Sequence, residues 1–132
     1  MKREVIFRGW DPIEGKWIYG SGVHSTPFRT YLLTDAGRLL EVEPETVGEW
    51  TGLHSNTGRK IFEGDVVSVK PHKGTLWIGV VKFHVHTASF DIHHGDYESD
   101  WFPLQDDFVM AIHGNIFEDE DLKNKYWEIY QK

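Results

Sequence analysis

Apolar and polar residues alternate along most of this chain in short runs, which turn-forming residues interrupt about every ten positions. Such alternation, bounded by Gly, Pro, Asn and Asp, predicts antiparallel strands joined by tight turns. In the first half, the expected strands are residues 4–10 and 16–19 (one hairpin), 31–34 and 38–42 (a second hairpin), and 47–51. Pro44 cannot donate a backbone hydrogen bond inside a sheet, so it is expected to end the second hairpin.

The second half continues the strand pattern and closes with a helix. Its expected strands, after a loop at 52–58, are residues 65–70, 75–86, 90–93 and 108–116. The four acids at 118–121 then favour a helix N-terminus. An amphipathic stripe follows at helical spacing, formed by Leu122, Tyr126, Ile129 and Tyr130. This stripe favours a helix that packs on its own domain, and docking on a partner chain is the alternative.

Together these elements predict a mainly β protein, either all-β or a β-dominated α+β fold. We expect an N-terminal β-meander at about residues 1–52, packed on an SH3-like or partly open barrel at about 53–117. A short C-terminal helix at 118–132 completes a single domain that spans residues 1–132. Strand residues should outnumber helical residues at least twofold.

The composition supports a folded domain. The chain has 132 residues, 39% of them hydrophobic, with six Trp, eight Phe and five Tyr available for a core. Cysteine is absent, which excludes disulfides, thiolate zinc sites and a cysteine nucleophile. Neither a signal-peptide core nor an apolar run of ~20 residues is present. A cytoplasmic location without a membrane partner is therefore expected.

The charge balance bears on possible partners. The formal charge is −7, from 21 acids and 14 bases. Contacts with phosphates dominate affinity for nucleic acids, so this balance disfavours nucleic-acid binding as the main task. Lys2, Arg3 and Arg8 form a small basic group near the start, a pattern that is typical of a solvated end of the chain.

Histidines are the first candidate for chemistry, because the chain has eight of them. His84 and His86 have the spacing that places two imidazoles on one face of a strand, and His93 and His94 follow in the next strand. Metal sites use such pairs, so His84, His86 and His93 are candidate metal ligands.

A solvated sheet face is the favoured interpretation of these histidines. The alternation places Val81, Phe83 and Val85 on the expected core face, so His84 and His86 point the other way, beside Lys82. A cationic neighbour disfavours a divalent ion. We therefore expect no metal at this face.

Other catalytic and cofactor motifs are missing. The serines have no Gly-x-Ser-x-Gly context and no adjacent His-Asp arrangement. The segment Gly20-Ser21-Gly22 lacks the third glycine and the strand-to-helix context of a phosphate-binding loop. No catalytic residue and no cofactor are assigned.

Three segments are more distinctive than generic turns. The first pairs aromatic residues across the hairpin of residues 7–20, the second spans residues 49–67, and the third spans residues 112–119. The residues that define them are Phe7, Arg8, Trp10, Trp17, Trp50, Thr51, Gly52, Leu53, Gly58, Gly64, Asp65, Gly114 and Asn115.

In order and spacing, these segments resemble the YopX family of phage and prophage proteins, over roughly residues 3 to 119. The central block is the specific part. The chain departs from the family pattern at Trp50, where Tyr is usual, and at residues 54–58, and both changes are conservative for a turn. The resemblance implies a phage or prophage gene in a bacterium, a β-rich fold and assembly into homo-oligomers. It implies no catalytic residues, because family members have no established activity.

Physical chemistry explains part of the central block. Gly58 can supply the positive φ of a tight turn, and Gly64 permits a bend before the strand that starts at Asp65. We expect the Asp65 carboxylate to cap neighbouring backbone N–H groups, which is a structural role.

Three function classes remain. A self-associating, non-enzymatic phage accessory protein is favoured, with a host or phage protein as a further partner. A metal-dependent or hydrolytic enzyme using the region of His84, His86 and His93 is second, and a nucleic-acid-binding or acidic DNA-mimic protein is third. Homo-oligomers are expected because six tryptophans exceed what one modest core encloses, and because the stripe of the C-terminal helix could contact a neighbour.

Overall fold

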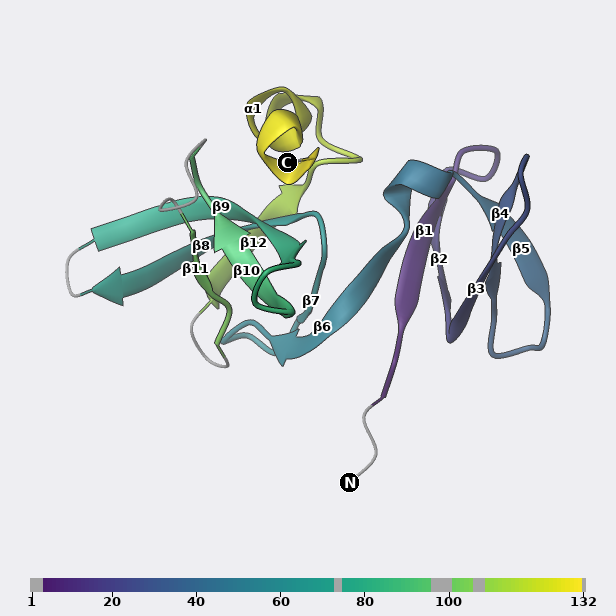
Figure 1. Cartoon of the computed structure of the whole chain (residues 1–132), viewed down its shortest axis with the longest axis horizontal. Helices are drawn as coiled ribbons and strands as arrows, with labels where there is room; N and C mark the ends of the chain where they lie inside the picture. Colours follow the sequence, from purple (N-terminus) through teal and green to yellow (C-terminus); the bar gives the residue numbers. More distant parts are fainter. Residues whose placement is uncertain (1–3, 73–74, 96–100, 106–108, 132) are drawn as a thin grey trace. The chain divides into compact units, whose positions relative to one another are not determined.

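The computed structural model describes residues 4–72, 75–95, 101–105 and 109–131 (Figure 1). Strands account for about 54% of the described residues and helix for 13%, which confirms the mainly β prediction. Contacts divide the chain into two compact units, Met1–Gly52 (unit 1) and Leu53–Lys132 (unit 2). Within the described residues, no helix has the length and apolar character needed to cross a membrane.

Unit 1 consists of short antiparallel strands. They are β1 (Phe7–Asp11), β2 (Lys16–Gly20), β3 (Gly22–Ser25), β4 (Thr30–Leu33) and β5 (Leu39–Val42), followed by a 3-10 turn at Pro44–Thr46 and by β6 (Gly48–His54). β1 and β2 form the predicted hairpin, in which Trp10 and Trp17 lie opposite each other with ring centroids 5.3 Å apart. β3, β4 and β5 form a separate three-stranded sheet.

Two strands of unit 1 differ from the prediction. β3 lies where the sequence predicts only a break, because its residues show no clear alternation and gain strand geometry by pairing with β4. β6 extends three residues beyond the predicted end and carries the chain into unit 2. The core of unit 1 is small and consists of the buried side chains of Ile18, Leu32 and Val42.

Unit 2 is built on one larger sheet. Its elements are β7 (Lys60–Phe62), β8 (Asp65–His72), β9 (Thr75–His84), β10 (Ser89–His93), β11 (Trp101–Pro103), β12 (Val109–Asn115) and α1 (Glu120–Gln131). Five of the strands lie in the order β11-β10-β9-β8-β12 and curl into a partly open barrel. The last strand is shorter than the expected range 108–116, of which residue 108 lies outside the described residues.

Both faces of this sheet are packed. On one face, the fully buried cluster is Ile61, Val67, Val69, Val81, Ile92, Leu104 and Val109. On the other face, Val66, Val80 and Ile116 pack against Tyr126 of α1. The stripe of the helix therefore packs within its own unit, which is the favoured of the two predictions.

A tight bend at Gly64 connects β7 to β8. Gly64 has φ 88°, and a Cβ at this position would lie 2.5 Å from Cε2 of Phe117. Asp65 follows, buried, and its Oδ2 accepts a hydrogen bond from the backbone N–H of Phe62 at 2.8 Å. The predicted capping role of Asp65 is confirmed.

Candidate functional site

The sheet of unit 2 holds a buried polar cluster, formed by Lys82, His84, Asp91 and His93 beneath Trp101. The antiparallel register of β9 and β10 sets Lys82 opposite Asp91, and alternate residues of paired strands share a face. These side chains therefore lie on the face of the sheet that also carries α1. Asp91 is fully buried, and His93 is only 9% exposed.

Hydrogen bonds tie Asp91 to the turn between β9 and β10. Nδ1 of His84 lies 3.1 Å from Asp91 Oδ2 and 2.9 Å from Thr87 Oγ1. Ser89 Oγ donates to Asp91 Oδ1 at 3.1 Å and lies 2.8 Å from Thr87 Oγ1. Asp91 Oδ1 thus accepts a hydrogen bond, whereas the buried Oδ2 has only the ion-pair contact with His84 and no hydrogen bond among the described residues.

Trp101 of β11 covers the histidines. Its ring centroid lies 4.6 Å from that of His84 and 6.4 Å from that of His93, nearly parallel to the latter ring. Nε2 of His93 is buried and makes no hydrogen bond within the described residues. Lys82 leaves the cluster and donates from Nζ to the backbone carbonyl of Ile129 at 3.2 Å. It thereby satisfies a carbonyl in the last turn of α1.

Burial dominates the electrostatics of this cluster. It raises the pKa of Asp91, against the lowering effects of the Ser89 hydrogen bond and the His84 charge. Burial also lowers the pKa of His93 to about 4, and the charges of Lys82, His84 and His94 add to that effect. The pKa of Lys82 is likewise lowered by burial. His93 is therefore neutral at pH 7.

The prediction of a solvated histidine face is wrong for His84, whose side chain is 13% exposed, whereas His86 is exposed as expected. β9 ends at His84 rather than at residue 86, and His86 lies in the turn that follows. Of the expected core residues, Val81 is buried, whereas Phe83 and Val85 are exposed. The face of His84 is covered instead, because α1 and Trp101 pack over it. Asp91 and Trp101 escaped the sequence analysis because their strand pairing is not local.

The cluster supports structure better than catalysis. The Thr87 hydroxyl lies at His84 Nδ1, the ring nitrogen that also faces Asp91, and the Ser89 hydroxyl contacts Thr87 and Asp91, so neither is placed as a nucleophile at Nε2. The rings of His84 and His86 lie 5.6 Å apart, and those of His84 and His93 lie 5.8 Å apart. Nevertheless, no three His, Asp or Glu side chains of the described residues are arranged to hold a metal ion. The contacts fasten β9, β10, β11 and α1 together.

The distinctive sequence segments also serve packing and turns, and they do not converge on one site. In unit 1, the buried guanidinium of Arg8 lies 4.4 Å from the Trp17 ring. In unit 2, Asn115 Oδ1 accepts hydrogen bonds from the backbone N–H groups of Phe117 and Glu118, both at 2.9 Å. The other segment residues are buried or half-buried (Phe7, Trp10, Trp50, Thr51, Leu53) or have positive φ (Gly52, Gly58, Gly114).

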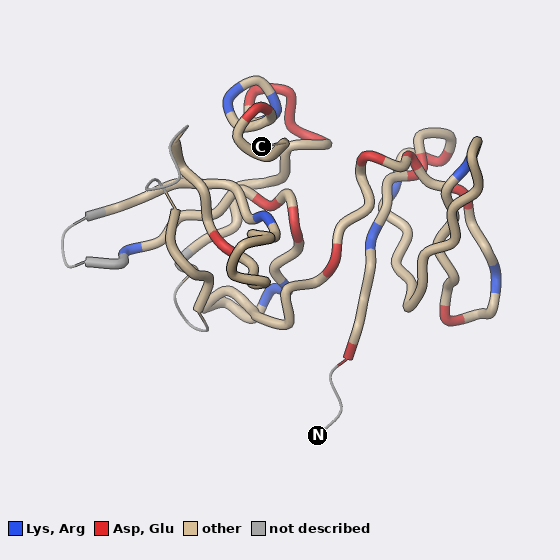
Figure 2. The backbone as a smooth tube through the Cα atoms, viewed as in Figure 1, with Lys and Arg blue, Asp and Glu red and all other residues tan. Residues whose placement is uncertain are grey.

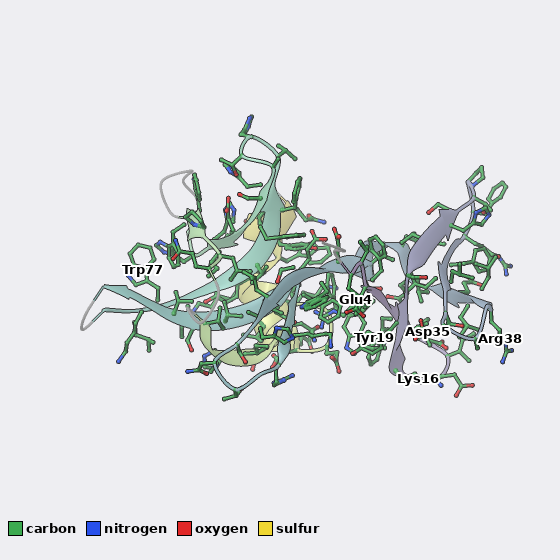
Figure 3. All side chains as sticks on the ribbon, turned by 90° about the horizontal axis from the view of Figure 1, so that it is seen from below. Glu4, Lys16, Tyr19, Asp35, Arg38 and Trp77 are labelled. Atoms are coloured by element: carbon green, nitrogen blue, oxygen red, sulfur yellow. The ribbon has the colours of Figure 1, made fainter. Side chains whose placement is uncertain are left out.

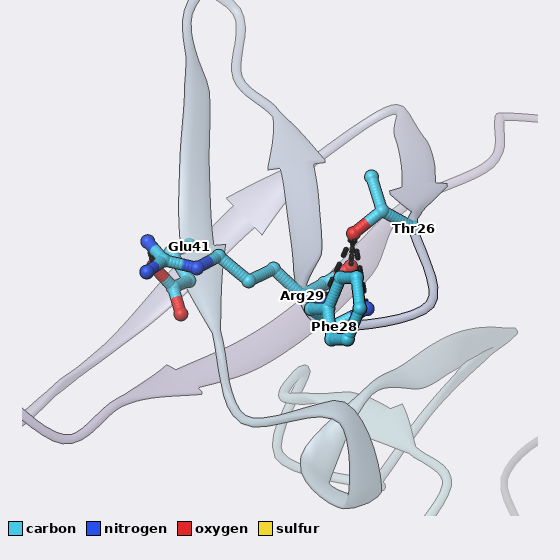
Figure 4. A network of polar contacts seen from close by, with 4 residues as sticks. All are labelled: Thr26, Phe28, Arg29 and Glu41. Atoms are coloured by element: carbon cyan, nitrogen blue, oxygen red, sulfur yellow. Dashed lines mark hydrogen bonds and ion pairs between the residues drawn. The ribbon is translucent and has the colours of Figure 1, made fainter.

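The surface of unit 1 carries a feature that the sequence analysis missed. The turn between β3 and β4 holds Phe28 at its tip with 92% of its surface exposed. Thr26 stabilises this turn, because its Oγ1 accepts from the N–H of Phe28 at 3.3 Å and from that of Arg29 at 3.0 Å (Figure 4). A lone aromatic residue inside a turn that starts with Thr-Pro is the signal that could have identified it.

The outer face of the β3-β4-β5 sheet is apolar at its other end, beside the β4–β5 turn. Leu33 and Leu39 lie opposite each other on β4 and β5 and are 40% and 53% exposed. Asp35 and Arg38, of opposite charge, project from the turn that joins these strands (Figure 3). All six tryptophans, in contrast, are buried or half-buried. The exposed apolar side chains of unit 1 are therefore aliphatic residues, Tyr19 and Phe28, and Phe28 lies at the end of β4 opposite to Leu33.

The structure is that of a small β protein with a partly open barrel, a C-terminal helix and a polar cluster packed into the sheet of unit 2. The model of the YopX protein family matches residues 6–122, and the chain belongs to this family. No curated protein matches the sequence.

Proposed function

We propose that this chain is a self-associating, non-enzymatic binding module, encoded by a phage or prophage and acting in the cytoplasm of the bacterial host. The resemblance to YopX proteins supports the genetic context. The observation that carries self-association is the apolar surface of unit 1, which is large relative to the core of that unit.

The distribution of exposed apolar side chains supports this proposal. Among the described residues, eleven large hydrophobic side chains are exposed, and seven of them belong to unit 1. These seven are Val5, Ile13, Tyr19, Val23, Phe28, Leu33 and Leu39. A concentration of exposed apolar side chains on a small unit is typical of a protein–protein interface. The Leu33–Leu39 pair is the best candidate for its centre, because the two side chains lie side by side on one sheet face.

Charge also favours unit 1 as the contact. Eight acids against six bases give unit 1 a net charge of −2, whereas thirteen acids against eight bases give unit 2 a net charge of −5. Two copies that meet through unit 1 therefore repel each other less than copies that meet through unit 2. A second copy is the expected partner, and a host or phage protein would bind elsewhere on the assembly.

The alternative functions have weaker support. The polar cluster of unit 2 has no placed nucleophile, and its carboxylate and Lys82 are both engaged in structural contacts. Among the described residues, Lys and Arg are scattered over both units rather than gathered into one strip (Figure 2). Nucleic-acid binding usually requires such a strip.

Light scattering of the full chain at micromolar concentration tests self-association. We expect a mass that is a multiple of 15.4 kDa, and a monomer at all accessible concentrations would refute the proposal. Replacing both Leu33 and Leu39 with Lys should produce monomers without changing the circular dichroism spectrum. The matched control is Leu76→Lys in unit 2, where the side chain is 55% exposed and the assembly should persist.

A further inference from the structure

We propose that the contact between copies is reciprocal: Phe28 and Arg29 at the β3–β4 turn of one copy insert into a pocket of a second copy, lined by Pro12, Ile13 and Pro44 and rimmed by acids. This inference rests on the proposed self-association and specifies which residues of the two copies are in contact.

The inserted element is a preorganised tip. Besides the two bonds to Thr26 Oγ1, the turn is closed by the backbone N–H of Thr26, which donates to the carbonyl of Arg29 at 2.8 Å. A turn that is already ordered loses little conformational freedom on binding. Phe28 is nearly fully exposed on it, and aromatic side chains on rigid supports are frequent anchors of interfaces.

The receiving element is a cavity of about 140 Å³ on the same unit. Pro12 and Ile13 from the β1–β2 turn and Pro44 after β5 provide apolar walls, and Asp11, Glu41 and Glu43 provide acidic groups. Asp11 shapes the first wall, because its Oδ1 accepts from the N–H of Ile13 at 2.9 Å. An apolar cavity of roughly 150 Å³ can hold benzene, so this cavity is large enough for the phenyl ring of Phe28.

Charge makes the two elements complementary. Arg29 is adjacent to Phe28 on the tip, and three carboxylates lie around the pocket. Within one copy, Arg29 lies 3.2 Å from Glu41, with both side chains more than half exposed (Figure 4). An ion pair in water contributes little, so Arg29 can exchange this partner for the acids of a second copy at small cost.

The position of Glu41 suggests the symmetry of the assembly. Glu41 contacts the tip through Arg29 and also lines the pocket, so tip and pocket are neighbours on unit 1. It shares the outer face of β5 with Leu39, two residues away. A two-fold axis close to Glu41 would bring each tip to the pocket of the other copy. A closed dimer follows rather than an open filament.

The test measures the dissociation constant of the dimer for the full chain and for variants that keep its fold by circular dichroism. Phe28→Ala should weaken association at least about tenfold. The matched control, Phe83→Ala in unit 2, removes an aromatic side chain that is 40% exposed and should leave association unchanged. Arg29→Glu and Glu43→Arg should each weaken association, and mixing the two variants should restore it through complementary contacts.

Different results distinguish failure of this contact from failure of self-association. If Phe28→Ala associates as the parent chain does while the double Leu33 and Leu39 variant is monomeric, self-association stands and this contact is wrong. Failure of the mixed charge variants to recover affinity would likewise overturn the contact. If the parent chain is monomeric, both self-association and the contact through Phe28 are wrong. This holds even if Phe28 binds another protein.

Discussion

The two units differ in how much of their apolar surface is buried. Unit 2 packs both faces of its sheet, one against the barrel interior and one against α1. Unit 1 has 52 residues and a core of three fully packed side chains, and most exposed apolar side chains belong to it. Small units with small cores usually depend on further stabilisation, such as an interface. This difference in packing is the reason for proposing that unit 1 presents the binding surface and that unit 2 is the scaffold.

The largest expected effect comes from truncating a core side chain in each unit. Ile92→Ala in unit 2 and Leu32→Ala in unit 1 both remove fully buried groups, at a cost of about 3–4 kcal/mol each. Amide hydrogen exchange should distinguish the two variants. Leu32→Ala should speed exchange of the amides in β3–β5, while the amides of β8 and β9 stay protected. Equal loss of protection in both units would contradict the division into a scaffold and a dependent unit.

The bend at Gly64 should show how tightly unit 2 is packed. Gly64→Ala should destabilise the chain by about 3 kcal/mol, because the new Cβ meets the Phe117 ring in addition to the strain of positive φ. Gly58→Ala is the matched control, since Gly58 has the same φ of 88° and open space around it. It should cost about 1 kcal/mol in urea denaturation. Similar losses of stability for both variants would mean that the Phe117 ring moves aside at little energetic cost.

Acid should weaken unit 2 through His93. The pKa of His93 is lowered to about 4 in the folded chain, whereas the unfolded residue titrates near pH 6.5. Between these values the unfolded state binds more protons, so stability falls as pH decreases from 6.5 toward 4, by about 2 kcal/mol. Asp91 acts in the opposite direction, because its raised pKa lets the folded chain gain stability on protonation.

Replacing His93 isolates its share of this pH dependence. In His93→Phe, the loss of stability between pH 6.5 and 4 should be smaller than in the parent chain, measured by urea denaturation at several pH values. The variant keeps an aromatic ring beside Trp101 and retains Asp91. An unchanged pH profile would show that His93 is accessible to protons in the folded state.

The smallest effect on stability is expected at the tip of unit 1. Arg29→Ala removes one exposed ion pair with Glu41 and should change the unfolding free energy by less than about 0.5 kcal/mol. The same change should measurably weaken association, if Arg29 contacts a second copy. A loss of stability without any loss of association would assign Arg29 to the fold of unit 1 alone.

The sequence by itself determined the local features of this protein. Alternation and turn residues predicted the mainly β fold and the Trp10–Trp17 hairpin, because strand period and turn conformation depend on adjacent residues. The spacing of the acids and apolar residues near the end predicted α1 for the same reason. The cap at Asp65 was predictable because its partner, Phe62, is three residues away.

Only the tertiary structure decided which surfaces are covered. β3 becomes a strand by pairing with β4, and Asp91 is buried on a strand that β9 and β11 flank. Phe28 is exposed because no element packs over its turn, which its apolar character does not reveal. Burial depends on residues that are distant in sequence, and local periodicity carries no information about them.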